Sequence, residues 1–113
     1  MNYGPIYMPI YGGGEGTAPA VTSAPSITGT AQVGQTLTAT PAVFTGDPAP
    51  TVTRQWEKST GGAYAAIEGA TDLTYDPVVG DVGATIRVTE MATNSKGTVT
   101  SSSAPTAAVI AAE

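Results

Sequence analysis

From residue 25 onward, the chain consists of short runs of β-forming residues separated by Gly, Pro, Asn and Asp. Within these runs, apolar residues keep a period of two, which places their side chains on one face of a strand. Nowhere do apolar residues recur with helical spacing over three turns. The pattern therefore predicts an all-β fold whose inward-facing strand residues form the core. By this parity the core residues are Leu37, Ala39, Val52, Trp56, Ile86 and Val88.

The spacing of the runs predicts about seven strands. They lie near residues 26–31, 35–40, 51–57, 64–67, 73–75, 85–93 and 98–109, the last with a break near 103–105. Turns are expected at Gly34 and over residues 46–50, 61–62, 80–83 and 94–97. A chain of 113 residues, 41% of them apolar, can fill one modest core. We expect a single domain over residues 25–110, followed by a short tail at 111–113.

Residues 1–24 differ from the rest of the chain and are expected to form an extended arm and linker. The unit Gly4-Pro5-Ile6-Tyr7 is followed directly by Met8-Pro9-Ile10-Tyr11, so a four-residue pattern occurs twice. Proline fixes its own φ angle and disfavours helix at the preceding residue, which favours an extended conformation here. Residues 12–16 are Gly-rich and predict a flexible joint, and residues 17–24 predict a stiffer spacer.

The Tyr, Ile and Pro side chains of this arm are the candidate binding site. Exposed apolar residues at this density are an adhesive liability, whereas the grooves of a partner would bury them. Extended peptides commonly bind by adding to the edge of a sheet or by placing alternate side chains in pockets. The alternative is a leader with no binding role. The residues expected to contact a partner are Tyr3, Pro5, Ile6, Tyr7, Met8, Pro9, Ile10 and Tyr11.

Charge and composition disfavour several classes of partner. The formal net charge is −5, which disfavours nucleic acid and anionic membranes. No apolar run approaches the roughly 20 residues of a membrane span. The first residues carry no Lys or Arg and are interrupted by Pro5 and Pro9, so we expect no secretory signal. We therefore expect the protein to be made in a cytoplasm and carried out by another assembly.

The chain contains no Cys and no His, so thiolate chemistry, Ser-His pairs and His metal ligands are excluded. Carboxylate pairs alone can hydrolyse glycosides, but most of the acids here fall at turns or outward positions, so we expect no catalysis and no cofactor. Asp72, Asp76 and Asp81 offer oxygen ligands for calcium. No EF-hand spacing supports such a site, and solvated turn residues are the favoured interpretation. Trp56 is interpreted as a core residue rather than as a platform for sugars.

Several spaced motifs carry a resemblance to a known family. They are the run from Pro25 to Pro41, the pair Gln55-Trp56, the turn Asp81-Val82-Gly83 and the segment Asn94-Ser95-Lys96-Gly97. Over residues 25 to about 109, the chain resembles the bacterial immunoglobulin-like repeats of surface adhesins and bacteriophage structural proteins. The resemblance implies an immunoglobulin-like antiparallel β-sandwich with Trp56 at its centre. It implies no catalytic residues, and function varies widely on this fold.

Arg54 and Glu90 depart from the pattern of these repeats, which usually carry an aromatic and an aliphatic residue at the two positions. Both residues share the inward parity of their strands, and the resemblance makes these strands antiparallel neighbours. If Trp56 lies opposite Val88, then Arg54 lies opposite Glu90. We therefore predict a cross-strand ion pair. The alternative is that both side chains reach solvent.

Repeats of this family usually work outside cells behind a secretion signal. A bacteriophage particle is assembled in the host cytoplasm and released by lysis, so it accommodates a chain without a signal. The resemblance leads us to expect a non-enzymatic capsid decoration protein on the virion surface, anchored by its arm. A phage tail or head-fibre component and a secreted carbohydrate-binding or adhesion module are the alternatives. The expected partners are the major capsid protein or tail and fibre proteins in a symmetric assembly, with weak glycan contact as a further candidate.

Overall fold

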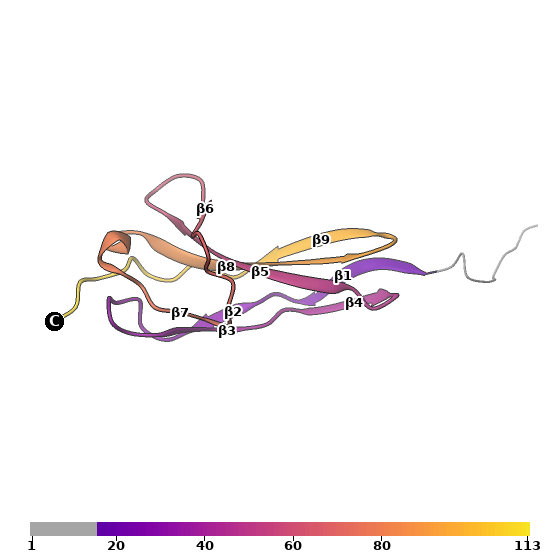
Figure 1. Cartoon of the computed structure of the whole chain (residues 1–113), viewed down its shortest axis with the longest axis horizontal. Helices are drawn as coiled ribbons and strands as arrows, with labels where there is room; N and C mark the ends of the chain where they lie inside the picture. Colours follow the sequence, from indigo (N-terminus) through magenta and orange to yellow (C-terminus); the bar gives the residue numbers. More distant parts are fainter. Residues whose placement is uncertain (1–15) are drawn as a thin grey trace, which may run out of the picture.

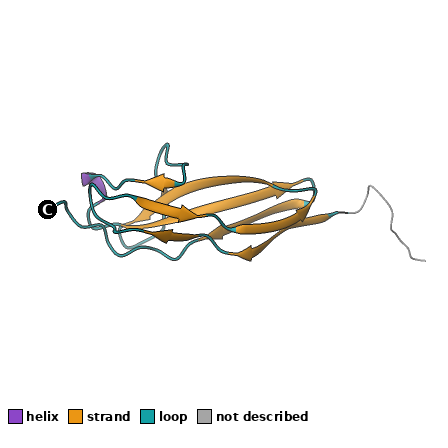
Figure 2. Cartoon of the chain, turned by 90° about the horizontal axis from the view of Figure 1, so that it is seen from below, coloured by secondary structure: helices purple, strands orange, loops and turns teal. Residues whose placement is uncertain are grey.

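Nine strands make up the described part of the molecule. The computed structural model describes residues 16–113, which form an antiparallel all-β domain with one short 3₁₀ helix, Val79–Asp81 (Figure 1, Figure 2). The strands are β1 (Thr17–Ser23), β2 (Ser26–Thr28), β3 (Leu37–Thr40), β4 (Val43–Asp47), β5 (Thr51–Ser59), β6 (Ala65–Ala66), β7 (Thr74–Tyr75), β8 (Thr85–Asn94) and β9 (Gly97–Ser102). Within this range no helix is long and apolar enough to cross a membrane. The all-β prediction is confirmed, whereas the predicted number of strands is too low.

The strands form two main sheets that face each other (Figure 1). One sheet has the order β6-β5-β8-β9, and the other has the order β2-β3-β7. A two-stranded sheet of β1 and β4 continues the smaller sheet toward the arm (Figure 1). All pairings between these strands are antiparallel, which gives a β-sandwich-like domain. The chain enters this domain at one end of the long axis, and the C-terminus lies at the other (Figure 1).

Two prolines interrupt the smaller sheet where β1 and β4 give way to β2 and β3. The pairing of β1 ends at Ser23 and that of β2 begins at Ser26, so Pro25 lies in a gap. Pro41 lies in the same gap on the partner side. Proline has no N–H, so neither residue can donate to the ladder. The N–H of Ala42 is left without a strand partner and donates instead to a carboxylate of the facing sheet.

Trp56 lies at the centre of the core. Its side chain has no exposed surface, and its indole N–H donates to the carbonyl oxygen of Asp72 at 2.8 Å. The ring of Tyr75 stacks on it, with the ring centroids 5.8 Å apart. The other large apolar residues of the buried cluster are Leu37, Ile86, Val88 and Val109. The prediction that Trp56 is a core residue is therefore confirmed.

The arm-proximal half of the domain differs from the sequence prediction. Residues 17–24 are predicted as a spacer, but most of them form β1, which pairs with β4 and belongs to the sandwich. The predicted turn over residues 46–50 begins only after Asp47, because β4 continues to that residue. Val52 is predicted as a core residue but is 43% exposed. At this position β5 has a neighbouring strand on one side only, so the side chain is left partly uncovered.

The segment after β9 ties the two main sheets together. The N–H of Ser103 donates to the carbonyl oxygen of Val88 in β8 at 2.8 Å. Further along, the N–H of Ile110 donates at 3.0 Å to Ala31, which follows β2 in the facing sheet. Val109 between these two contacts is buried. The last predicted strand, over residues 98–109, is thus regular only to the end of β9. The residues after it form an irregular segment that hydrogen-bonds to both main sheets.

Candidate functional site

The predicted partner-binding residues lie outside the described residues; they are Tyr3, Pro5, Ile6, Tyr7, Met8, Pro9, Ile10 and Tyr11. The structure does describe the junction where the arm joins the domain. Gly16 has a φ angle of +150° there, and a Cβ atom on this residue would come 2.6 Å from the carbonyl oxygen of Asp47. Only glycine fits this conformation and this approach without strain. The junction therefore packs closely against the domain at Asp47.

Asn94 holds this junction in place. Its side-chain Nδ2 donates to the carbonyl oxygens of Thr17 and Pro48, at 2.8 and 2.9 Å. Its Oδ1 accepts the N–H of Lys96 at 2.8 Å. The amide thus connects the start of β1, the turn after β4 and the β8–β9 hairpin. The predicted turn at residues 94–97 is confirmed, but this role of Asn94 was not predicted, because its partners lie 77 and 46 positions away in the chain.

The predicted ion pair between Arg54 and Glu90 is confirmed. The two residues lie opposite each other in the β5–β8 ladder, two positions from the pair of Trp56 and Val88. Arg54 Nε lies 2.7 Å from Glu90 Oε2, and the Glu90 side chain is completely buried. The second carboxylate oxygen, Oε1, accepts the N–H of Ala42 at 2.9 Å. Because a buried carboxylate is tolerated only where its charge and lone pairs are matched, Glu90 acts as a polar link between the two sheets.

Asp81 is a second buried carboxylate. Its Oδ1 accepts a hydrogen bond from Lys58 Nζ at 2.8 Å, and its Oδ2 accepts from the Tyr75 hydroxyl and from the N–H of Val78. Burial acts to raise the pKa of Asp81, but the hydrogen bonds from Lys58, Tyr75 and Val78, with the Lys58 charge, lower it below its ordinary value. Burial, followed by the hydrogen bond to Asp81 and its charge, raises the pKa of Tyr75. The cluster fastens the loop before β8 to β5 and β7.

The Asp81 cluster predicts a loss of stability in acid. Because the folded pKa lies below the ordinary value of 3.8, folding favours the ionised carboxylate. This contribution is complete above that value and is lost as the pH falls through the folded pKa. Urea unfolding at about pH 6 and about pH 3 should therefore show a larger difference between native protein and Asp81→Asn at the higher pH. A difference that does not shrink in acid would contradict this assignment.

The structure does not bring Asp72, Asp76 and Asp81 together around one point. The carboxylate of Asp81 is turned into the domain toward Lys58 and Tyr75, whereas Asp72 and Asp76 are exposed. The interpretation of these three acids as solvated turn residues is correct for Asp72 and Asp76 and wrong for Asp81. Among residues 16–113, no group of three or more Asp, Glu, His or Cys side chains is placed to hold a metal ion.

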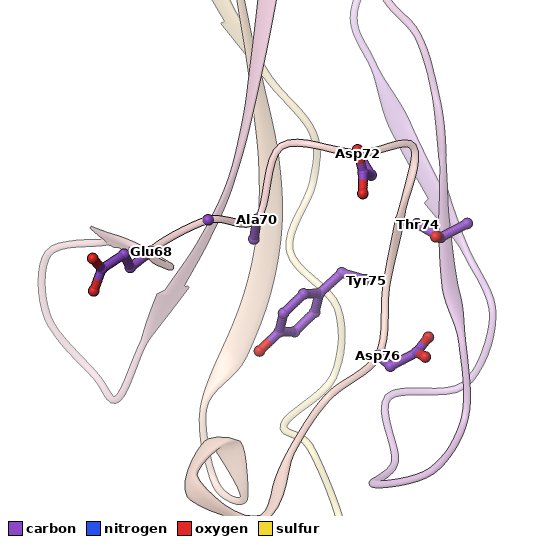
Figure 3. A pocket seen from close by; sticks show the side chains of 7 residues that line it. Glu68, Ala70, Asp72, Thr74, Tyr75 and Asp76 are labelled. Atoms are coloured by element: carbon purple, nitrogen blue, oxygen red, sulfur yellow. The ribbon is translucent and has the colours of Figure 1, made fainter.

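Asp72 and Asp76 line an open pocket of about 330 Å³ beside β7 (Figure 3). Glu68, Thr74 and Tyr75 also line it. Figure 3 shows Glu68 across the pocket from Asp72 and Asp76, so the three carboxylates do not converge. Catalysis and metal binding both require polar groups that meet at one point. The pocket therefore offers an acidic, polar surface without an assembled reactive group.

No protein-family model matches this chain, and no curated protein matches it either. Function must therefore be inferred from the sequence of the arm and from how the domain is built around the junction at Gly16.

Proposed function

We propose that this protein is a non-enzymatic structural component of a bacteriophage particle, namely a capsid decoration protein displayed on the virion surface. The arm binds another virion protein, such as the major capsid protein, through its Tyr, Ile and Pro side chains. The β-sandwich projects from that anchor. A symmetric particle repeats the same binding site many times, so many copies of the chain are displayed on it.

The arrangement of the sheets supports assigning the domain to the immunoglobulin-like class. Strands β2, β3 and β7 face a sheet in which β5 and β8 are central neighbours, and β5 carries the buried Trp56. Immunoglobulin-type sandwiches place their third and sixth strands side by side and bury a Trp on the third. Repeats of this class occur in phage structural proteins, and this resemblance points to a virion.

The observation that carries the proposal is the position of the arm's junction. The arm joins the domain at one end of its long axis, and the C-terminus lies at the opposite end (Figure 1). Gly16 and Asn94 fix the chain at this junction through backbone approach and two hydrogen bonds to carbonyl oxygens. A domain joined at its end in this way can extend its full length away from the surface that binds the arm. This geometry suits display.

Deletion of residues 2–11 is expected to abolish binding to phage particles without unfolding the domain. The deletion leaves Gly16, β1 and Asn94 in place, so the sandwich keeps all the contacts described above. Purified particles lacking the protein are incubated with each variant, and occupancy is measured by gel densitometry and cryo-EM density. The matched control is Val79→Lys, at a side chain that is 78% exposed at the end of the domain opposite Gly16, and it should keep full occupancy (Figure 1).

Normal occupancy of the deletion variant would contradict the anchoring role of the arm. The position of the cryo-EM density distinguishes a capsid decoration protein from a tail or head-fibre component, because the latter would appear away from the capsid shell. A protein that binds glycan arrays but no particles would instead favour the secreted adhesion module.

A further inference from the structure

One edge of the sandwich is left open near the junction at Gly16. β4 belongs to a sheet of two strands, in which it pairs only with β1. β1 itself lies beside β9, where a Cβ atom on Gly97 would come 3.5 Å from the Cβ of Ala18. No strand within residues 16–113 pairs with the other edge of β4. Backbone groups along that edge are therefore available to an added strand.

β4 itself carries few of the features that usually prevent strand addition, because the two irregular points of its pairing with β1 place the extra residues in β1. Natural edges are protected by charged side chains, prolines, bulges or a covering element. β4 has the sequence Val-Phe-Thr-Gly-Asp, with no Lys and no Pro, and its single charge lies at its last residue. Val43 on this strand is 51% exposed. Val52 on β5, four residues before the first backbone contacts of β5 on this side at Trp56, is 43% exposed. Apolar side chains and unpaired backbone thus occur together.

The arm has the sequence of a strand that can use only one edge. Successive residues of an extended chain point their N–H groups to alternate sides. Pro5 and Pro9 have no N–H and are four positions apart, so both fall on the same side. The N–H groups of the even-numbered residues point to the other side. Such a segment can add to the edge of a sheet but cannot be a central strand. No charged side chain precedes Glu15, so the segment brings no charge to an apolar edge.

A second copy of the chain is within reach of the arm. Thr17 in β1 pairs with Asp47 at the end of β4, so the chain enters the domain one strand away from the open edge. Residues 12–16 span at most about 18 Å when extended, more than the roughly 5 Å between neighbouring strands of one sheet. Two copies lying side by side can therefore each place residues 3–11 on the β4 edge of the other. Such a reciprocal exchange closes a twofold dimer and covers both edges.

We propose that, in the free protein, residues 3–11 of one copy add as a strand to the β4 edge of a second copy, and reciprocally. This inference goes beyond the anchoring role, because it names the partner of the arm before any particle is bound. The binding site on the particle and the β4 edge compete for the same segment. The exchange also removes the apolar side chains of the arm from solvent until the particle takes them up.

Sedimentation velocity of the full chain tests the exchange. The expected result is a dimer of the 11.2 kDa chain that dissociates on dilution, and a monomer at all concentrations after deletion of residues 2–11. The double variant Val43→Lys/Val52→Lys should weaken dimerisation at least about tenfold, because it places charges on the edge. The matched control Val78→Lys/Val79→Lys carries the same charge change at the far end of the domain and should leave dimerisation unchanged. The proposal would be overturned if the full chain stayed monomeric. It would also be overturned if Val78→Lys/Val79→Lys abolished the dimer while Val43→Lys/Val52→Lys did not.

Disulfide trapping identifies the contact, because the chain has no cysteine of its own. Protein carrying Ile6→Cys is mixed with protein carrying Thr45→Cys and oxidised. The expected product is a covalent dimer with one chain of each kind, and Val79→Cys in place of Thr45→Cys should give none. If a chain carrying both Ile6→Cys and Thr45→Cys links only within itself, the arm covers its own edge and the exchange is refuted. Binding to particles is measured in a separate experiment. The trapping result therefore does not decide whether the arm anchors the protein to a particle.

Discussion

Replacing Trp56 with alanine is expected to lower the free energy of unfolding by about 3–5 kcal/mol. The indole has no exposed surface, stacks on Tyr75 and donates its N–H to the carbonyl oxygen of Asp72. The substitution opens a cavity between the sheets and leaves that carbonyl oxygen without its partner. Domains commonly have a total free energy of unfolding of about 5–15 kcal/mol, so this variant should be close to unfolding at room temperature.

Urea unfolding followed by circular dichroism measures this loss. Trp56→Phe is the control, because it keeps an aromatic ring against Tyr75 and removes the indole N–H. Its loss should be clearly smaller than that of the alanine variant. A loss of less than about 1 kcal/mol for Trp56→Ala would show that the core does not depend on this side chain.

Replacing Arg54 with alanine is the second large effect, with an expected loss of about 3–5 kcal/mol. The variant removes the charge partner of Glu90, which is completely buried in the native protein, and leaves its carboxylate bonded to the N–H of Ala42. Adding Glu90→Leu should recover most of the loss, because the uncompensated charge is then gone. The double variant is therefore expected to be more stable than Arg54→Ala alone.

A double-mutant cycle with urea unfolding measures the coupling between the two residues. The chain offers a matched control in Glu57 and Arg87, which pair across the same two strands at the same 2.7 Å. Their side chains are 19% and 32% exposed on the outer face, so their coupling should not exceed about 1 kcal/mol. Equal coupling energies in both pairs would show that burial of Glu90 does not decide the effect.

The register of the central sheet could be predicted from the sequence. β8 is long, and its buried residues alternate regularly, so a shift of one residue would turn Ile86, Val88 and Ala92 to solvent. Placing Trp56 opposite Val88 therefore placed Arg54 opposite Glu90, as the structure has it. The resemblance to bacterial immunoglobulin-like repeats supplied the remaining information, namely that these two strands are neighbours.

The arm-proximal sheet and the Asp81 cluster could not be predicted in the same way. β1 contains Pro19, which argues against a strand, and it is tolerated because β1 and β4 form a sheet of only two strands. The run Val43-Phe44-Thr45 was the one local signal for β4. Asp81 follows a run of turn-like residues, and its partner Lys58 lies 23 positions earlier in the chain. Contacts of this kind depend on tertiary packing and leave no trace in local periodicity.

The junction at one end of the long axis also determines how the domain carries mechanical load. A pull on the arm enters at Gly16 and runs along β1, which lies along the long axis (Figure 1). Because β1 and β4 are antiparallel neighbours, this pull slides one strand past the other and strains their hydrogen bonds together. A pull across the sheet would break them one after another. If the arm anchors the chain as proposed, resistance to a pull on that anchor resides in shear of the β1–β4 pair.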